Sequence, residues 1–174
     1  VEADPSKLNL TAFETFYPEK RPFFVEGGSF FTPQWSETGD SWQKGSFMYQ
    51  PIKVFHSRRI GKAPNYFMPA DGNIISASEN TTILGAAKVL GKTPSGINYG
   101  FIESLTDNEI GVLESEDGSR SEFLLESRTN YFIGRIEAPF INNASILGAT
   151  FTDVRRAKGD NASVGVFDWR LRFL

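Results

Sequence analysis

The end of the chain alternates sharply between apolar and polar side chains. Over residues 163–174, the odd positions include Phe167, Trp169, Leu171 and Phe173, whereas the even positions include Asp168, Arg170 and Arg172. Successive side chains of a β-strand point to opposite faces, so this run predicts a strand with one apolar and one charged face. A transmembrane strand needs about 9–11 residues, and an average strand has about 5–6. The length of the run favours a transmembrane strand.

Comparable runs predict about five antiparallel strands in the second half of the chain. They lie near residues 82–92, 97–106, 122–136, 144–155 and 163–174. The connections at 93–96 and 138–143 are short, whereas 107–121 is a long acidic loop whose residues 109–114 could extend the flanking strands. Short turns at one end and longer polar loops at the other are typical of an outer-membrane β-barrel.

The same alternation assigns side chains to two faces of the predicted sheet. The apolar face is expected to contain Ile97, Tyr99, Phe101, Phe123, Leu125, Tyr131, Ile133, Leu147, Ala149 and Phe151. The opposite face is expected to contain Asn98, Gly100, Ser104, Glu122, Glu126, Arg128, Asn130, Thr150 and Thr152. We expect the apolar face to contact lipid and the polar face to line a lumen. A soluble antiparallel sandwich would show the same alternation.

Residues 1–80 differ from residues 81–174, and we treat the two as separate parts. The first part predicts irregular structure with one short helix, which starts at the capping box Thr11-Ala12-Phe13-Glu14 and ends before Pro18. Residues 21–31 are too apolar to be solvated and too rich in glycine to be helical. We expect this first part to lie inside the barrel or at its periplasmic mouth.

Composition excludes several classes of protein. The 174-residue chain has a net charge of −3 and no long basic stretch, which argues against a nucleic-acid partner. It has no cysteine, so disulfides and thiolate metal sites are excluded. No run approaches the roughly 20 apolar residues of a membrane helix, but barrel strands carry a weaker signal. The first residue is Val1, and we expect both ends to be cuts through a longer chain.

Three segments carry a family resemblance: residues 1–14, the run Pro18-Glu19-Lys20-Arg21-Pro22-Phe23-Phe24, and Ser57-Arg58-Arg59-Ile60-Gly61. They resemble the carboxy-terminal part of large Gram-negative proteins classed as domain of unknown function 5916, which usually follows a module similar to carbohydrate-binding family nine. The resemblance implies a cell outer-membrane β-barrel, of which this chain would supply a part. It also implies lipid contact, a link to glycans, and contact with other outer-membrane proteins or the remainder of the same chain.

Candidate site residues are few. His56 is the only histidine, which removes a serine or cysteine triad and most zinc sites. Ligand binding is assigned to Trp35, Trp42 and Tyr49, which could stack on sugar rings, and to Arg58 and Arg59. The two arginines could bind a phosphate or an acidic sugar, or pair with carboxylates of the lumen. We assign no catalytic residue, metal ligand or cofactor.

Carboxylates leave one enzymatic alternative open. Glu14, Glu19 and Glu26 could supply the two acids of a glycosidase, but helix capping by Glu14 and pairing of Glu19 with Lys20 or Arg21 are favoured. We therefore expect a non-enzymatic surface or transport component linked to glycan binding. The alternatives are a soluble carbohydrate-binding β module and, third, a glycan hydrolase.

Overall fold

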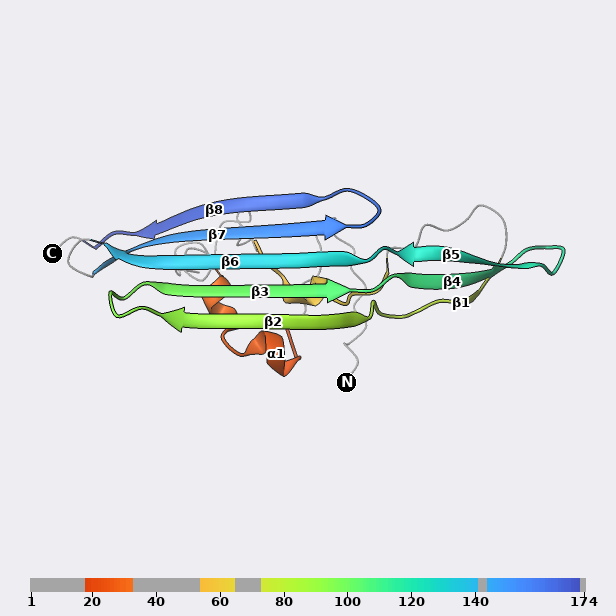
Figure 1. Cartoon of the computed structure of the whole chain (residues 1–174), viewed down its shortest axis with the longest axis horizontal. Helices are drawn as coiled ribbons and strands as arrows, with labels where there is room; N and C mark the ends of the chain where they lie inside the picture. The colour runs from red at the N-terminus through yellow and green to blue at the C-terminus, as the bar shows by residue number, and fades with distance from the viewer. Residues whose placement is uncertain (1–17, 33–53, 65–72, 141–143, 173–174) are drawn as a thin grey trace, which may run out of the picture.

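The alternating runs form long antiparallel strands, as Figure 1 shows. The computed structural model describes residues 18–32, 54–64, 73–140 and 144–172. The main sheet has five strands in the order β2-β3-β6-β7-β8. Their bounds are β2 Ile83–Lys92, β3 Asn98–Thr106, β6 Thr129–Phe140, β7 Ser145–Arg156 and β8 Ala162–Arg170. The predicted all-β antiparallel class is confirmed.

A second, three-stranded sheet extends beyond one end of the main sheet (Figure 1). It has the order β1-β4-β5, with β1 Asn73–Ser76, β4 Glu109–Glu114 and β5 Arg120–Glu126. The chain passes from β3 through Asp107 and Asn108 into β4, and from β5 through Ser127 and Arg128 into β6. Residues 109–114, which were predicted to extend the flanking strands, do form a strand, but this strand belongs to the second sheet; β1 was not predicted.

The predicted strand over residues 122–136 is wrong, because the chain changes sheet at Ser127 and Arg128. Ser127 Oγ donates a hydrogen bond to the Lys158 carbonyl at 2.7 Å, and the Arg128 amide donates to Asn108 Oδ1 at 2.7 Å. Arg128 also forms an ion pair with Asp107 at 3.0 Å. With these contacts the pairing of β5 with β4 ends, and the pairing of β6 with β3 begins at Thr129. Arg128 therefore lies at this junction and not among lumen charges.

The described residues before β1 contain single helical turns: α1 Pro22–Val25, η1 Gly28–Phe31 and η4 Ser57–Arg59. The prediction that residues 21–31 are not helical is wrong for α1 and η1. Proline stands at the start of α1, where its fixed φ suits the first helical turn. Gly27, with φ 66°, separates the two turns. No helix among the described residues is long and apolar enough to cross a membrane.

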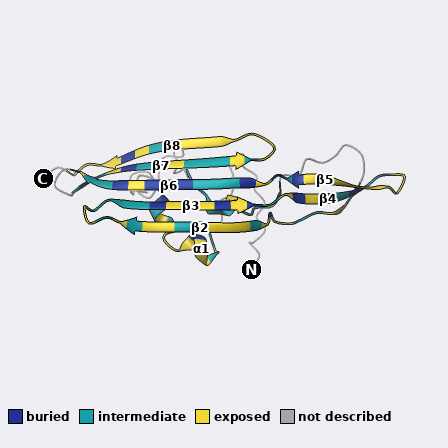
Figure 2. Ribbon diagram, viewed as in Figure 1, coloured by how far each residue is buried: buried dark blue, intermediate teal, exposed yellow. Residues whose placement is uncertain are grey.

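The two faces of the main sheet differ in what lies over them. One face, called the covered face, carries Ile102, Ile133 and Arg135; the other, called the open face, carries Phe101, Phe151 and Trp169. Phe24, Phe31 and Ile60 pack with Ile102 and Ile133 in the hydrophobic core. The core therefore lies between the covered face and the helical turns, and among the strands of the main sheet Figure 2 shows buried segments mostly on β3 and β6.

Tyr131 and Ile133 were predicted on the apolar, lipid-facing side, and this is wrong for both, because they lie on the covered face and pack in or against the core. In the register, Ile133 lies opposite Ile102 on the covered face and is 1% exposed. Asn130, predicted on the polar face, has the same phase as Phe132 and lies on the open face. The sequence Tyr131-Phe132-Ile133 is apolar at every position, so alternation alone does not select which side faces the core.

The main sheet is open at both edges. β2 pairs only with β3, and β8 pairs only with β7, among the residues that the structure describes. These residues do not close into a barrel. The far side of each edge strand presents backbone N–H and C=O groups without a ladder partner in this part of the chain.

Candidate functional site

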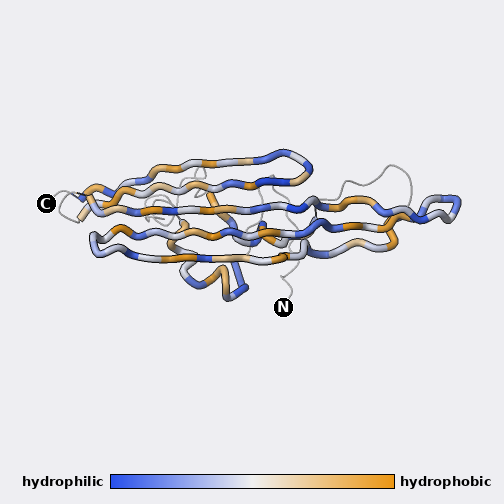
Figure 3. Tube along the Cα trace, in the orientation of Figure 1, coloured by the Kyte–Doolittle hydropathy of each residue, from blue (hydrophilic) through white to orange (hydrophobic). Residues whose placement is uncertain are grey.

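The open face of the main sheet carries a broad apolar surface. Exposed large side chains on it include Val89, Phe101, Ile136, Phe140, Leu147, Phe151, Phe167 and Trp169. Phe167 is 79% exposed and Trp169 is 68% exposed. Figure 3 shows hydrophobic segments recurring along these strands. A large apolar surface in contact with solvent is unusual in a soluble monomer and indicates a contact with lipid or with another protein.

Aromatic rings follow one another across the open face. Tyr99, Phe101, Phe132 and Phe151 form a series whose successive ring centroids are 6.2, 6.4 and 6.4 Å apart. Gly134 lies among them, and a Cβ atom there would come within 3.1 Å of the Phe101 ring and 3.3 Å of the Phe132 ring. The missing side chain lets two rings lie over the strand. This series joins three adjacent strands by ring contacts on the open face.

Polar side chains gather at one end of the open face. Asn130 Nδ2 donates to Glu103 Oε1 at 2.9 Å, and Arg155 pairs with Asp153 at 2.7 Å. From Gly134 to Phe140 the open-face positions of β6 are Gly134, Ile136, Ala138 and Phe140. This apolar stretch spans about 20 Å at about 3.4 Å per residue. The open face therefore consists of an apolar band with a polar margin toward the three-stranded sheet.

The covered face contains a buried ion-pair cluster around Arg135. The Arg135 side chain is fully buried; its Nη1 and Nη2 donate to the two Asp168 oxygens at 2.7 and 2.8 Å. Its Nε and Nη2 donate to Glu137 Oε1 at 3.2 and 2.8 Å, and Nη1 also donates to Thr150 Oγ1 at 2.6 Å. The guanidinium contacts side chains of β6, β7 and β8 and therefore joins three strands.

Lys88 attaches the helical turns to the covered face. Its ammonium group donates to the Phe23 carbonyl at 2.5 Å and to the Glu26 carbonyl at 2.6 Å. It also lies 4.9 Å from the centre of the Phe23 ring. A cation at these positions satisfies carbonyl groups near the end of α1, which have no partner within so short a helix. Lys88 therefore ties residues distant in sequence to β2.

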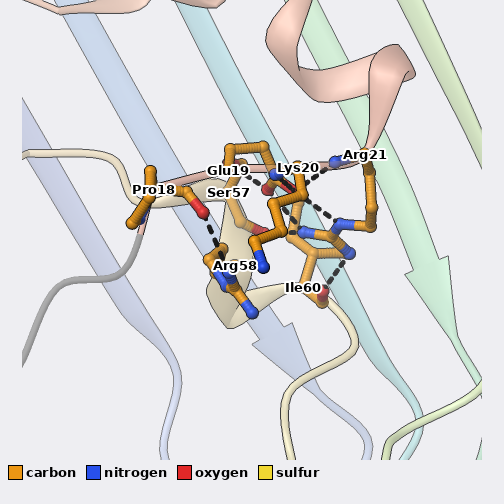
Figure 4. A network of polar contacts seen from close by, with 7 residues as sticks. All are labelled: Pro18, Glu19, Lys20, Arg21, Ser57, Arg58 and Ile60. Carbon is orange, nitrogen blue, oxygen red and sulfur yellow. Dashed lines mark hydrogen bonds and ion pairs between the residues drawn. The ribbon is translucent and has the colours of Figure 1, made fainter. Parts of the chain in front are cut away.

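A second polar cluster joins the two segments that carry the helical turns (Figure 4). Arg21 Nε and Nη2 donate to the two Glu19 oxygens at 2.8 and 2.7 Å. Arg21 also donates to the carbonyls of Ile60 and Ser57 at 2.7 and 2.9 Å, and Ser57 Oγ donates to Glu19 Oε2 at 2.6 Å. The predicted pairing of Glu19 with Arg21 is confirmed. The motif that carried the family resemblance thus has a structural role.

Glu19 is held in its charged form by this cluster. Partial burial acts to raise its pKa, but hydrogen bonds from Arg21 and Ser57 outweigh that effect and lower the pKa from 4.5 to about 2. A general acid works best with a pKa near the operating pH. Glu19 is therefore poorly suited to donate a proton at neutral pH, which argues against its use as the acid of a glycosidase.

The predicted ligand-binding residues fall in different parts of the chain. Trp35, Trp42 and Tyr49 lie outside the residues that the structure describes, as does the predicted helix starting at Thr11. Arg58 and Arg59 form most of η4, and Arg58 Nη1 donates to the Pro18 carbonyl at 2.8 Å. Arg58 thus contributes to the cluster of Figure 4. Within the described residues, no group of three or more His, Cys, Asp or Glu side chains could hold a metal ion.

A family comparison accounts for nearly the whole chain. The profile described as Domain of unknown function (DUF5916) matches residues 1–172. The chain belongs to the DUF5916 family. No curated protein and no solved structure matches it. The name DUF5916 assigns no activity, so the function must be argued from the geometry of this member.

Sequence reasoning missed the Arg135 cluster of this DUF5916 chain. Arg135 and Glu137 are two residues apart, so their side chains lie on the same face of β6. The sequence alone could have predicted this pair. The contact with Asp168 depends on the register of β6, β7 and β8, in which Gly148 separates Glu137 from Asp168. Prediction of the contact between Arg135 and Asp168 would have required the order of the strands in the sheet.

Proposed function

We propose that this chain forms part of the wall of an outer-membrane β-barrel, with its helical turns held on the lumen side. In this proposal the open face contacts lipid and the covered face lines the interior. The barrel acts as a surface or transport component linked to glycans and does not act as an enzyme. For this function the chain has to insert into the membrane, keep lipid out of the barrel interior and hold the helical turns in place.

The distribution of polarity and burial carries this proposal. Side chains on the open face are mainly apolar, whereas the buried side chains of the covered face include Ser104, Thr106, Thr129, Arg135, Thr150 and Asp168. A soluble sandwich would place its apolar face inside and its charged face in water. Membrane barrels alternate in the opposite sense, apolar outward and polar inward.

Dimensions of the open face agree with a membrane setting. β2, β3, β6, β7 and β8 each have 9 to 12 residues, which matches the 9–11 residues or so needed to cross a bilayer at a tilt. The apolar stretch of about 20 Å on β6 approaches the apolar band of about 25 Å in outer-membrane barrels. Trp169 and Phe140 lie toward its end, where aromatic side chains commonly meet the membrane interface.

The open edges support completion of the sheet by further strands. In a bilayer, unpaired backbone groups at β2 and β8 would each cost several kcal/mol, since lipid offers no hydrogen bonds. The proposal therefore includes partner strands for both edges, from the same protein or from another copy. The link to glycans rests on the family resemblance and not on a described sugar-contacting residue.

The test begins with full-length protein extracted from bacterial membranes. A closed barrel should require detergent for extraction and should migrate differently on a gel before and after boiling. Two single-cysteine variants then compare neighbouring faces: Phe151→Cys on the open face and Thr152→Cys on the covered face. These 174 residues contain no cysteine. Any cysteine elsewhere in the full-length protein is first replaced by serine, so that each label reports one position.

We expect Phe151→Cys in membranes to be protected from a charged maleimide and to react with a lipid-soluble one. Thr152→Cys should not react with the lipid-soluble reagent unless the protein is unfolded. Both cysteines should react with the charged reagent after boiling in detergent. Freely soluble protein, with Phe151→Cys open to the charged reagent, would contradict the proposal and favour a soluble β module.

A further inference from the structure

The two ends of the main sheet differ in how the chain connects the strands. At one end, called the turn end, residues 93–97 link β2 to β3 and residues 141–144 link β6 to β7. At the other end, called the second-sheet end, β3 is linked to β6 through β4 and β5, which pair with β1 in the second sheet. Figure 1 shows this sheet reaching past the ends of β3 and β6.

Side-chain contacts at its base hold the second sheet in place. Glu109, the first residue of β4, is 7% exposed, and its carboxylate accepts hydrogen bonds from the Thr82 amide at 2.6 Å and from Ser78 Oγ at 2.7 Å. The Asp107 amide donates to the Thr82 carbonyl at 2.9 Å, and the Asp107 carboxylate pairs with Arg128. The second sheet is therefore a built extension of the wall and not a free loop.

The far end of the second sheet carries charges that do not suit hydrocarbon. Glu116, Asp117, Arg120 and Glu122 are exposed there, and Arg120 also pairs with Glu114 at 3.3 Å. Charged side chains are costly to place in the hydrocarbon core of a bilayer. If the main sheet crosses a bilayer, the second sheet therefore lies in water on one side of it.

The apolar band of the open face is placed asymmetrically between the two ends. It reaches the turn end, where Phe140 is the last residue of β6 and is 43% exposed. At the second-sheet end the band stops before the strands do, because Asn130, Asp153 and Arg155 occupy the open face there. A bilayer fitted to the band leaves the turns near one interface, and leaves the polar margin and the second sheet beyond the other.

We propose that the second-sheet end faces the cell exterior and that the turn end faces the periplasm. This inference rests on the proposed function, because it assigns a direction to the same wall. Outer-membrane barrels have short periplasmic turns and longer extracellular loops, and the connections of this chain differ in the same way. The second sheet is then presented to the external medium as a fixed hairpin, and residues 93–97 meet the periplasm.

The same direction orders the helical turns along the barrel interior. α1 and η1 lie toward the turn end, since a Cβ atom at Gly27 would meet the Leu90 side chain, close to the last residue of β2. The segment after η4 lies toward the second-sheet end, where the Lys62 carbonyl accepts from the Thr81 amide at 2.9 Å and from Thr81 Oγ1 at 2.8 Å. α1 and η1 thus occupy the periplasmic half of the interior, and the segment after η4 reaches the exterior half.

The test compares two serines in intact cells of a Gram-negative host that carries the full-length protein. Ser119 lies beside the turn of the second sheet, Ser95 lies in the turn between β2 and β3, and both are exposed. Ser119→Cys and Ser95→Cys are therefore matched variants, and any other cysteine of the full-length protein is replaced by serine. The reagent is a maleimide on a polyethylene glycol too large to cross the outer membrane or to pass through a barrel.

We expect Ser119→Cys to react in intact cells, and Ser95→Cys to react only after the outer membrane is permeabilised. Reaction of Ser95→Cys alone in intact cells would overturn the proposed direction. Reaction of both variants in intact cells, or of neither, would also overturn it.

Heat-modifiability of the same variants separates this inference from the proposed function. A heat-modifiable outer-membrane protein with the opposite labelling would keep the wall and reverse its direction. Freely soluble protein that does not shift on boiling would remove the wall and the direction together.

An epitope inserted in each turn gives a second readout that does not depend on cysteine reactivity. Exposed turn tips tolerate insertions, so one epitope is placed between Asp117 and Gly118 and the other between Ser95 and Gly96. Antibody should bind intact cells that carry the first insertion, and should bind the second only after permeabilisation. The reverse pattern would overturn the proposed direction.

Discussion

Gly148 of β7 lies directly opposite Asp168 of β8, and the space left by its missing side chain is where the Asp168 carboxylate meets Arg135. A Cβ atom at position 148 would lie 2.7 Å from both Asp168 oxygens and 2.8 Å from Arg135 Nη2. The glycine is therefore required by a close approach of charged groups. Its role is to admit an ion pair into a packed face of the sheet.

Gly148→Ala should accordingly destabilise the fold. The added methyl group displaces the Asp168 carboxylate, and overpacking of this kind costs about 1–3 kcal/mol. The free energy of unfolding is measured by urea titration of the protein in detergent. Gly165→Ala is the matched control, because no atom lies within 4 Å of a Cβ at that position. Equal stability of the two variants would contradict this account of Gly148.

Arg135→Met should be among the most destabilising single substitutions in the sheet. It leaves the carboxylates of Glu137 and Asp168 buried without their common partner, which costs about 3–5 kcal/mol. Arg155→Met is the control, because the Arg155–Asp153 pair is largely solvent-exposed on the arginine side and such pairs contribute about 0–1 kcal/mol. The two variants are compared by urea titration under identical conditions.

A triple variant separates loss of the ion pairs from loss of packing. Arg135→Met combined with Glu137→Gln and Asp168→Asn removes both stranded charges, so it should recover part of the stability lost in the single variant. If the triple variant is less stable than Arg135→Met, the penalty arises from packing and not from unpaired charge.

Acid should weaken the contact between the segments that hold Glu19 and Ser57. The pKa of Glu19 is lowered to about 2 in the folded protein from an ordinary value of 4.5. The unfolded chain therefore takes up this proton first, and the contribution of Glu19 is present above about pH 4.5 and disappears as the pH falls toward about 2. We expect the stability difference between wild type and Glu19→Gln to follow that course.

This pH dependence is measured as the urea midpoint at a series of pH values. Ser57→Ala removes one of the hydrogen bonds to the Glu19 carboxylate and should give a smaller acid-dependent loss than the wild type shows. A constant difference between wild type and Glu19→Gln from neutral pH to about pH 2 would contradict the assigned role of the carboxylate.

Phe167→Arg distinguishes lipid from water on the open face. Phe167 is 79% exposed, so in water its replacement by arginine should be nearly neutral. In a bilayer the same change should cost about 2–4 kcal/mol, because a lipid-facing arginine near the membrane centre is poorly solvated. The measurement is the fraction of protein that assembles into the heat-modifiable form. Ala162→Arg, near the polar end of β8, should assemble as the wild type does.

The strands near Phe167 and Trp169 could be predicted because their alternation is unambiguous. The face of Ile133 could not, because Tyr131, Phe132 and Ile133 are all apolar and the contacts with the helical turns decide which of them is buried. The family resemblance identified the segments containing Glu19 and Ser57. It did not reveal that Arg21 binds carbonyls in the later segment, since that contact depends on tertiary structure.

The strand break at Ser127 and Arg128 is another feature that the local sequence could not predict. Both residues have neighbours compatible with a strand, and the break arises from hydrogen bonds with Asn108 and Lys158, which are distant in sequence. β1 has only four residues, and it is recognised by its pairing with β4. Local pattern thus determined most strand positions, whereas strand ends and side-chain partners depended on the assembled sheet.

β4 and β5 lie between β3 and β6 along the chain and connect the outer end of the molecule to the interior of the main sheet. Beyond the main sheet, β4 and β5 make an arm whose six paired residues reach about 20 Å and end in a turn at Asp117 and Gly118. At its base the arm joins Thr106 and Thr129, which are paired and fully buried. A displacement of the turn at the tip of the arm would therefore act on this buried pair, which lies beside the core that holds the helical turns.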